Sequence, residues 1–255
     1  MRRRNRWTVV ALAATLFGFA SLCSAASPST PPSISAAITD PARPAADTER
    51  DGLRKPAETL TFAGIKPGDQ VLELGAGKGY FTRLLSAVAG PQGSVTIYTV
   101  SAPPKPDQLP PPLKAIIADA HYANVHLNLE RLIDAKPSAT FDLVWTTQNY
   151  HDFHNVPGID MAVLNRAIFD SLKPGGVYFV LDHAAEAGSG ARDTNTLHRI
   201  DRATVIEEVR AAGFVLAGEG DFLRNSADPH SAKVFDASIQ GHTDQFALKF
   251  RKPKP

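Results

Sequence analysis

The sequence is poor in cysteine and has no marked excess of charge of either sign. Its 255 residues contain a single cysteine, Cys23, which lies in an N-terminal leader. A mature chain without that leader can form no disulfide and has no thiol for catalysis. The 27 basic and 26 acidic residues nearly balance, so there is no electrostatic reason to expect nucleic acid or an anionic membrane as a partner.

The sequence also lacks a hydrophobic run of ordinary membrane-spanning length. The apolar run at residues 7–22 is short for a span, four arginines precede it, and small residues follow at 24–26. This order is typical of a secretory signal peptide over residues 1–26, cleaved after Ala25 or Ala26. We expect an exported, periplasmic protein with no stable membrane insertion after cleavage. An uncleaved N-terminal anchor ranks second, and lipidation of Cys23 ranks third.

The composition is that of a globular protein of ordinary type. Hydrophobic residues make up 43% of the chain and charged residues 21%, which excludes a disordered, collagenous or polytopic membrane protein. Residues 27–46 are rich in Ser, Pro and Ala without an apolar period, and this pattern predicts a linker. One compact domain is expected over residues 47–255.

Strand-like and helix-like segments alternate along that domain. A helical stretch is expected from Asp47, with Pro56 in the first turn of a helix that Gly64 ends. Strands are predicted at 71–74, 95–100, 125–129, 141–146, 177–181, 214–217 and 246–250, and helices at 80–88, 113–119, 159–172 and 202–212. This alternation predicts a doubly wound, Rossmann-like α/β fold, with a mostly parallel seven-stranded sheet and helices on both faces.

The turn after the first strand carries the strongest chemical signal, PGDQVLELGAGKGYFTRLL at 67–85. Its glycines let bare backbone approach a ligand at a helix N-terminus, which suits a nucleotide-like cofactor. A dinucleotide fingerprint would need glycine where Tyr80 stands. A P-loop would need Ser or Thr after Lys78, where Gly79 stands.

This segment resembles the first motif of the class I S-adenosylmethionine-dependent methyltransferases. Glu73 followed by Gly75, Ala76, Gly77 and Gly79 matches that motif, and FDLV at 141–144 and LKPGGVYFVLD at 172–182 match later strands. The resemblance implies S-adenosyl-L-methionine as cofactor, with the glycines against its amino-acid end and sugar. It also implies that Glu73 helps to order the loop and the methionine amino group.

More narrowly, four further segments resemble a group of exported bacterial proteins that are predicted methyltransferases. They are NYHD at 149–152, DHAA at 182–185, TLHRID at 196–201 and TDQFALKF at 243–250.

The chain departs from the superfamily after the second strand. The acid that usually holds both ribose hydroxyls there is missing, and Ser101 is the first polar residue. A hydroxyl lacks the charge of a carboxylate, so we expect it to bind a diol less tightly by about 1–2 kcal/mol. After the third strand, Asn128 and Glu130 are the candidates for contacts to adenine.

Polar side chains follow the fourth and fifth strands, where open α/β sheets bind their ligands. His151 is the favoured general base, with Asp152 or Asp182 to orient it. Asn149 and Tyr150 would hold a small-molecule substrate. His183 is the other candidate base, or an anchor for a mobile loop at 184–195.

A third polar cluster comprises His198, Arg199 and Asp201. Its simpler interpretation is that Asp201 caps a helix and that the other two are surface residues. The corresponding simpler interpretation of Tyr150 is packing.

Two other functions stay open. The cofactor is a cytoplasmic metabolite whereas the leader directs the chain outwards, so an exported small-molecule-binding protein with a degenerate methyltransferase fold is one alternative. The other is a metal-dependent enzyme using His151, His154, Asp182 and His183, although their local spacing is not a strong metal signature.

Overall fold

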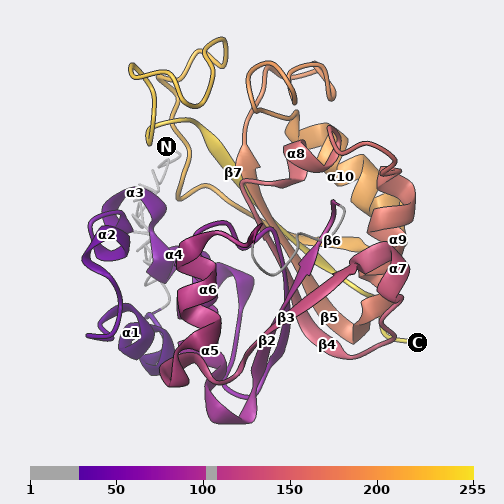
Figure 1. Ribbon diagram of the computed structural model, residues 1–255. Coiled ribbons are helices and arrows are strands. Elements are labelled where there is room, and N and C mark those ends of the chain that lie inside the picture. The colour runs from indigo at the N-terminus through magenta and orange to yellow at the C-terminus, as the bar shows by residue number, and fades with distance from the viewer. Residues whose placement is uncertain (1–28, 102–107) are drawn as a thin grey trace, which may run out of the picture.

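The computed structural model describes residues 29–101 and 108–255. The predicted signal peptide lies outside these residues. The centre of the fold is one seven-stranded sheet with the order β3-β2-β1-β4-β5-β7-β6 (Figure 1). The strands are β1 Gln70–Leu74, β2 Ser94–Thr99, β3 Val125–Arg131, β4 Phe141–Thr147, β5 Leu172–His183, β6 Val215–Gly220 and β7 Gln245–Arg251. β1 to β5 pair in parallel, and β7 runs antiparallel to both β5 and β6.

Helices cover both faces of the sheet (Figure 1). On one side lie α1 Pro32–Ile38, α2 Ala45–Thr48, α3 Asp51–Arg54, α4 Pro56–Ala63, α5 Tyr80–Ala89 and α6 Pro111–Ala118. On the other lie α7 Leu132–Ala135, α8 Tyr150–Phe153, α9 Met161–Ser171 and α10 Arg202–Ala211. Short 3₁₀ turns occupy Gly90–Gln92 and Ala120–Tyr122. The predicted fold class and all seven predicted strands are confirmed.

The sheet separates two hydrophobic clusters because successive side chains of a strand point to opposite faces. On β1, Val71 packs with the cluster under α1, α4 and α5. Leu72 and Leu74 pack with the cluster under α9 and α10. Glu73 therefore points to the same face as Val71, and only 2% of it is exposed. A strand buried on both faces reads as a continuous apolar run, which is why it could be predicted.

The predicted linker at 27–46 is wrong for the residues that form α1. Ile34 is fully buried and Ala37 is 3% exposed, and α1 packs against α4 and α5. Pro32 at the first helical position is compatible with the helix because its missing N–H would be unpaired there anyway. The abundance of proline hid an ordered element that belongs to the domain.

The helical stretch expected from Asp47 is three short helices rather than one. Lys55 has φ of 43°, which separates α3 from α4. The residue before a proline is disfavoured in the α region, so Pro56 begins a new helix instead of continuing the old one. Gly64, at φ 86°, ends α4 as predicted.

One feature of the sheet indicates where a ligand can bind. The strand order reverses between β1 and β4, and open α/β sheets bind ligands at the carboxyl ends of the strands at such a point.

Among the described residues, no helix is long and apolar enough to cross a membrane.

Candidate functional site

A cavity of about 260 Å³ opens at the carboxyl ends of the strands beside the glycine loop. The loop contributes Gly75, Ala76 and Gly77, the end of β2 contributes residues 97–101, and Asp152 and Phe153 come from α8. Further lining residues are Leu109, Pro110, Leu113, Leu127 and Val156. The lining is mostly apolar, and Asp152 is its only carboxylate among the described residues.

The glycines have backbone conformations that other residues rarely adopt. Gly75, Gly77 and Gly79 have φ of 73°, 57° and 81°. A Cβ on Gly77 would meet no atom within 4 Å, whereas one on Gly75 would lie 2.7 Å from the Asn149 amide nitrogen. Bare backbone at Gly77 thus faces open space, and bare backbone at Gly75 admits Asn149.

The structure brings only some of the predicted cofactor residues to this cavity. The three loop residues Gly75 to Gly77 line it, as the resemblance implied, and so does Ser101, which follows the second strand where the superfamily has its acid. Gly79 does not line it. Asn128 and Glu130 do not; the Asn128 side chain accepts a bond from the Glu130 backbone N–H at 2.9 Å instead. Leu127 is the residue of β3 that reaches the cavity, and the expected adenine contact from Asn128 or Glu130 stays a prediction.

Glu73 is buried below the loop. Its carboxylate accepts a hydrogen bond of 2.7 Å from the Thr82 hydroxyl of α5. Burial raises the pKa of Glu73 to about 7, although the Thr82 bond opposes this rise. The geometry supports a role in fastening the loop strand to α5, and it does not place the carboxylate in the cavity lining.

Asn149 and Tyr150 have structural contacts that the sequence did not reveal. The Asn149 amide donates to the backbone oxygens of Gly75, at 2.8 Å, and Thr147, at 2.6 Å. Tyr150 is fully buried; its hydroxyl donates to Glu208 at 2.7 Å and accepts from Asn165 at 2.8 Å. The predicted substrate contact of Tyr150 is therefore wrong, because no part of its ring or hydroxyl is exposed.

His151 lies between two carboxylates. Its backbone N–H and its Nδ1 each donate to Asp182 at 2.8 Å, and its Nε2 lies 3.2 Å from Asp152. Burial would lower the pKa of His151, but the two carboxylates outweigh burial and raise it to about 10. A protonated ring has no lone pair with which to accept a proton, so this state of His151 is not a general base.

The pKa of His183 is shifted in the opposite direction from that of His151. Its Nδ1 lies 2.7 Å from the Thr243 hydroxyl, and burial lowers its pKa to about 4. It therefore carries a neutral ring at neutral pH. His183 lines a second cavity of about 300 Å³ with Arg50, Arg54 and Gln148.

Arg54 and Gln148 are the site residues that sequence reasoning missed. The Arg54 guanidinium donates to the Gln148 side-chain oxygen at 2.7 Å and stacks over the ring of Tyr80 at 4.8 Å. Gln148 has φ of 56° and donates to Gln245 at 2.9 Å. The position of Gln148, just after a predicted strand and before NYHD, could have indicated a site residue. No pattern in the sequence around Arg54 indicated that α3 would contribute to the site.

The third cluster divides between structural and exposed roles. Asp201 accepts from the Ala203 backbone N–H, so it is the helix cap of the simpler interpretation. Arg199 is fully buried against Asp228, at 2.8 Å, and is not a surface residue. His198 is partly exposed; its Nδ1 lies 3.4 Å from the Asp152 carboxylate.

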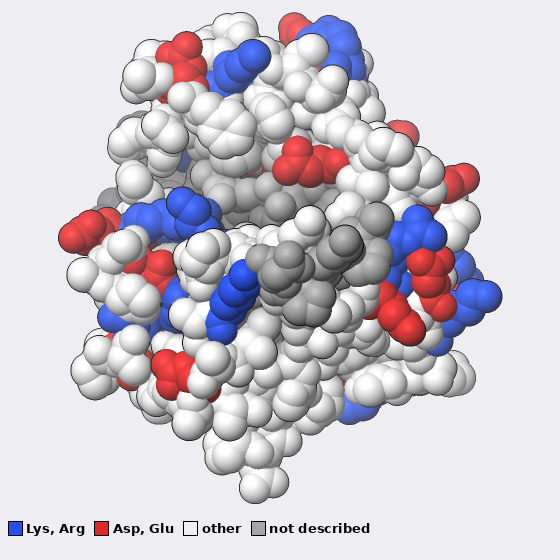
Figure 2. Space-filling model, in the orientation of Figure 1, with Lys and Arg blue, Asp and Glu red and all other residues white. Residues whose placement is uncertain are grey.

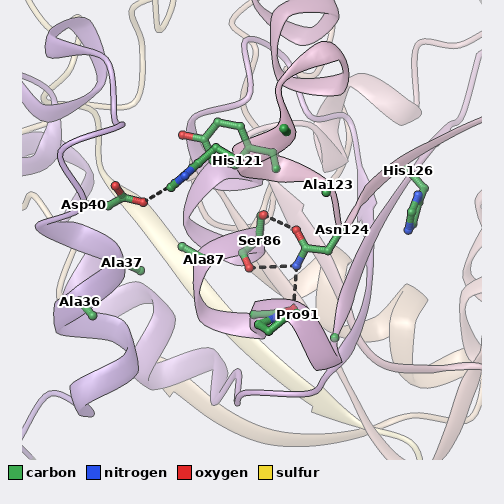
Figure 3. A pocket seen from close by; sticks show the side chains of 14 residues that line it. Ala36, Ala37, Asp40, Ser86, Ala87, Pro91, His121, Ala123, Asn124 and His126 are labelled. Atoms are coloured by element: carbon green, nitrogen blue, oxygen red, sulfur yellow. Dashed lines mark hydrogen bonds and ion pairs between the residues drawn. The ribbon is translucent and has the colours of Figure 1, made fainter.

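A larger cavity, about 660 Å³, lies elsewhere, between α1, α5 and the segment before β3. Figure 3 shows that its polar side chains face one another: Ser86 and Asn124 are hydrogen-bonded at 2.5 Å, and His121 pairs with Asp40 at 2.8 Å. Size therefore does not identify the site here. The convergence of glycine backbone, imidazoles and carboxylates at the strand ends does.

The charged side chains around the hollow are unevenly distributed. Figure 2 shows a hollow in the face that is turned to the viewer, with basic side chains gathered at its left and acidic ones at its upper rim. The cavity beside His183 has two arginines and no carboxylate among its lining residues. Such a lining favours a ligand with an anionic group.

Comparisons with known proteins agree with the geometry. A model of a methyltransferase domain matches residues 48–216. The ubiquinone/menaquinone biosynthesis C-methyltransferase of Vibrio cholerae is 28% identical over 197 residues, covering 75% of this chain. The corresponding enzyme of Legionella pneumophila is 24% identical over 205 residues, again covering 75% of this chain. This chain spans 65% of the Vibrio protein's length and 67% of the Legionella protein's length.

Solved structures share the fold at low sequence identity. A S-adenosylmethionine-dependent methyltransferase from Aquifex aeolicus has a TM-score of 0.56 and 15% identity, over 80% of this chain and 98% of that one. The [4+2]-cyclase SpnF has a TM-score of 0.55 and 20% identity, over 83% and 82%. The same fold thus carries different activities, and the function has to be argued from the site.

Proposed function

Because the chain belongs to the methyltransferase domain family, within the class I S-adenosylmethionine-dependent superfamily, we propose that it transfers a methyl group from S-adenosyl-L-methionine to a small molecule. The observation that carries the proposal is the cavity at the glycine loop, where bare backbone at Gly77 faces open space. Helix α5, ten residues long, begins directly after this loop, so its N-terminal end lies next to the glycines.

The lining of this cavity suits the nucleoside part of the cofactor. Residues 97–100, Leu113 and Leu127 offer apolar surface to a flat ring. Ser101 offers a hydroxyl where the superfamily usually has a carboxylate, so the sugar is held without a charged acceptor from the end of β2. We expect cofactor affinity to be modest for this reason.

The acceptor binds in the second cavity, beside His183. The segment after β4 contributes to both cavities. Gln148 lines the cavity beside His183, and Asp152, four residues later, lines the cofactor cavity. Arg50 and Arg54 favour an acceptor with an anionic group, and Gln148 and Thr243 offer neutral hydrogen-bonding groups. A volume of about 300 Å³ is the size of a small-molecule site.

Geometry favours His183 over His151 as the group that receives the acceptor's proton. Both ring nitrogens of His151 face carboxylates, at 2.8 and 3.2 Å. His183 has one nitrogen held by Thr243 and lines the acceptor cavity. A base must reach the proton that it removes, and the position of His183 in the lining of the acceptor cavity supports it in this role.

Calorimetric titration with S-adenosylmethionine and S-adenosylhomocysteine tests the cofactor site. Gly77→Val introduces a branched side chain into the open space of the cavity, and we expect it to abolish binding. Gly64→Val is the matched control, because Gly64 also has a positive φ, 86°, and also has no atom within 4 Å of its added Cβ, but it lies at the end of α4 away from the cavity.

Three results of this titration would contradict the proposal. They are absence of binding to the unaltered chain, equal affinity in folded Gly77→Val, and equal loss in the Gly64→Val control. The first of these would favour the exported binding protein with a degenerate methyltransferase fold.

A further inference from the structure

Three side chains, of which Asp152 lines the cofactor cavity, are arranged like the ligands of a metal ion. One ligand atom each from His151, Asp152 and His198 lies within 4.8 Å of the other two. We infer that these residues bind a divalent transition-metal ion, with Asp182 behind His151 as the group that orients it. No sequence pattern indicated this set, because His198 is distant in the chain from the other two.

The distances fit a coordination sphere. His151 Nε2 lies 3.2 Å from the Asp152 carboxylate, and His198 Nδ1 lies 3.4 Å from the same oxygen. Ligands about 2.1 Å from a common ion are about 3.0–3.4 Å apart along the edges of an octahedron or tetrahedron. The third pair of ligand atoms, on His151 and His198, lies within 4.8 Å, so sharing an ion requires some side-chain movement. The ion replaces the proton that His151 carries in the metal-free state, because an imidazole binds a metal through a deprotonated nitrogen.

Asp182 supplies the second contact that metal-binding histidines usually have. It is fully buried and bonds the Nδ1 of His151 at 2.8 Å, so it fixes the ring and directs the other nitrogen toward Asp152. It also accepts from the backbone N–H of His151 at 2.8 Å. Metal-ligating histidines commonly donate their other ring N–H to a carboxylate in this way.

His198 is held in place at an energetic cost. Its φ is 56°, a region that side chains other than glycine enter rarely. The adjacent Arg199 is fully buried in an ion pair with Asp228, and the His198 ring packs on Phe235 with centroids 4.9 Å apart. Backbone strain kept by surrounding structure occurs preferentially at functional sites.

The donor atoms indicate which ions would bind. Two imidazoles and one carboxylate favour zinc or ferrous iron over calcium or magnesium, which prefer oxygen ligands alone. Three protein ligands leave coordination positions for water or a substrate oxygen. Of the set proposed from sequence, only His151 belongs to this cluster; His154 pairs with Glu208 at 3.2 Å and His183 with Thr243 at 2.7 Å.

The position of Asp152 suggests what the ion does. Since Asp152 also lines the cofactor cavity, an acceptor oxygen bound to the ion would stand at the edge of that cavity. The acceptor class is thus a molecule with a hydroxyl or carboxylate oxygen able to bind the ion. Only this role rests on the proposed function, because metal binding itself is measured without the cofactor.

Titration of the chelator-stripped chain with Co²⁺ tests the site, followed by calorimetry and by the visible absorption of bound cobalt. We expect one ion per chain, and competition by Zn²⁺. His198→Ala removes a partly exposed ligand with little risk to the fold, and we expect an affinity loss of at least about 10-fold. His121→Ala is the control, because His121 also pairs with a carboxylate, Asp40, but lies outside the cluster.

Asp182→Asn is the second variant, and it retains all three ligands. We expect a loss of about 10–100-fold in affinity, the usual effect of removing such an orienting carboxylate. Absence of bound Co²⁺ at millimolar concentration would overturn the inference. So would equal affinity in folded His198→Ala, or an equal loss in His121→Ala. Loss of S-adenosylhomocysteine binding alone would count against the proposed function and not against the metal site.

Discussion

At the scale of single residues, several ionisable groups have environments that change their chemistry. Glu73 is 2% exposed, and its one side-chain partner is the neutral Thr82. Burial raises its pKa to about 7 from a usual value of 4.5. The folded state thus binds this proton more tightly than the unfolded state does. Stability contributed by the protonated group is present below about pH 4.5 and is lost as the pH rises through about 7.

Glu73→Gln should remove this dependence. The variant keeps the size of the side chain and has no charge, so we expect it to be more stable than the unaltered chain at about pH 8, by on the order of 3 kcal/mol at most. Urea unfolding at about pH 5 and about pH 8 measures the difference. The exposed Glu58→Gln is the control and should leave the pH dependence unchanged. An equal fall in stability with pH in Glu73→Gln would contradict the assignment.

The sequence predicted the loop glycines better than the side-chain roles, for a physical reason. The conformation at Gly75 and Gly77 follows from a strand that runs directly into a helix, which is a local relation. The environments of Tyr150 and His151 depend on Glu208 and Asp182, which lie far away in the sequence. Residue types alone cannot show which histidine is enclosed by carboxylates and which is neutral.

At the scale of elements, apolar periodicity predicted the strands and the helices whose own sequences carry a clear apolar pattern. The strands contain runs of buried residues. The helices after the glycine loop have capping residues that mark where they begin or end, such as the N-cap Asp201 before α10. α1 has only a short apolar pattern in a segment rich in proline and serine, so its order comes from packing against α5 rather than from its own sequence.

α1 should therefore contribute measurably to stability. Ile34 is fully buried between α1 and the rest of the domain, and Ile34→Ala should lower the free energy of unfolding by about 2–5 kcal/mol. Chemical unfolding measures this change. Ser35→Ala, on the exposed side of the same helix, is the control and should stay within about 0.5 kcal/mol. A loss below about 1 kcal/mol in Ile34→Ala would mean that α1 docks only loosely.

At the scale of the whole molecule, the reversal of strand order places the two cavities at one end of the sheet. β1 and β4 lie side by side; the loop after β1 lines the cofactor cavity, and the segment after β4 contributes to both cavities. Topology of this kind follows from the alternation of strands and helices. The contribution of α3 to the acceptor cavity does not, because it depends on how the N-terminal helices pack.

We also propose that the mature chain begins close to its first helix. Cleavage after Ala25 or Ala26 would leave only a few residues before α1 at Pro32. Mass spectrometry of the protein from its native host should then find Ala26 or Ser27 as the first residue. An intact Met1 on a protein recovered from the cytoplasm would contradict export, and it would also remove the difficulty of cofactor supply.

The hydrogen bond from Asn149 to the Gly75 backbone oxygen ties the two ligand sites to each other. Under the proposed function, a cofactor that orders the glycine loop also orders the segment from Gln148 to Asp152, which lines the proposed acceptor cavity and carries two residues of the proposed metal site. The binding equilibria of the two ligands are then thermodynamically linked. Linkage is reciprocal: an acceptor must raise the affinity for the cofactor by the same factor that the cofactor raises the affinity for the acceptor.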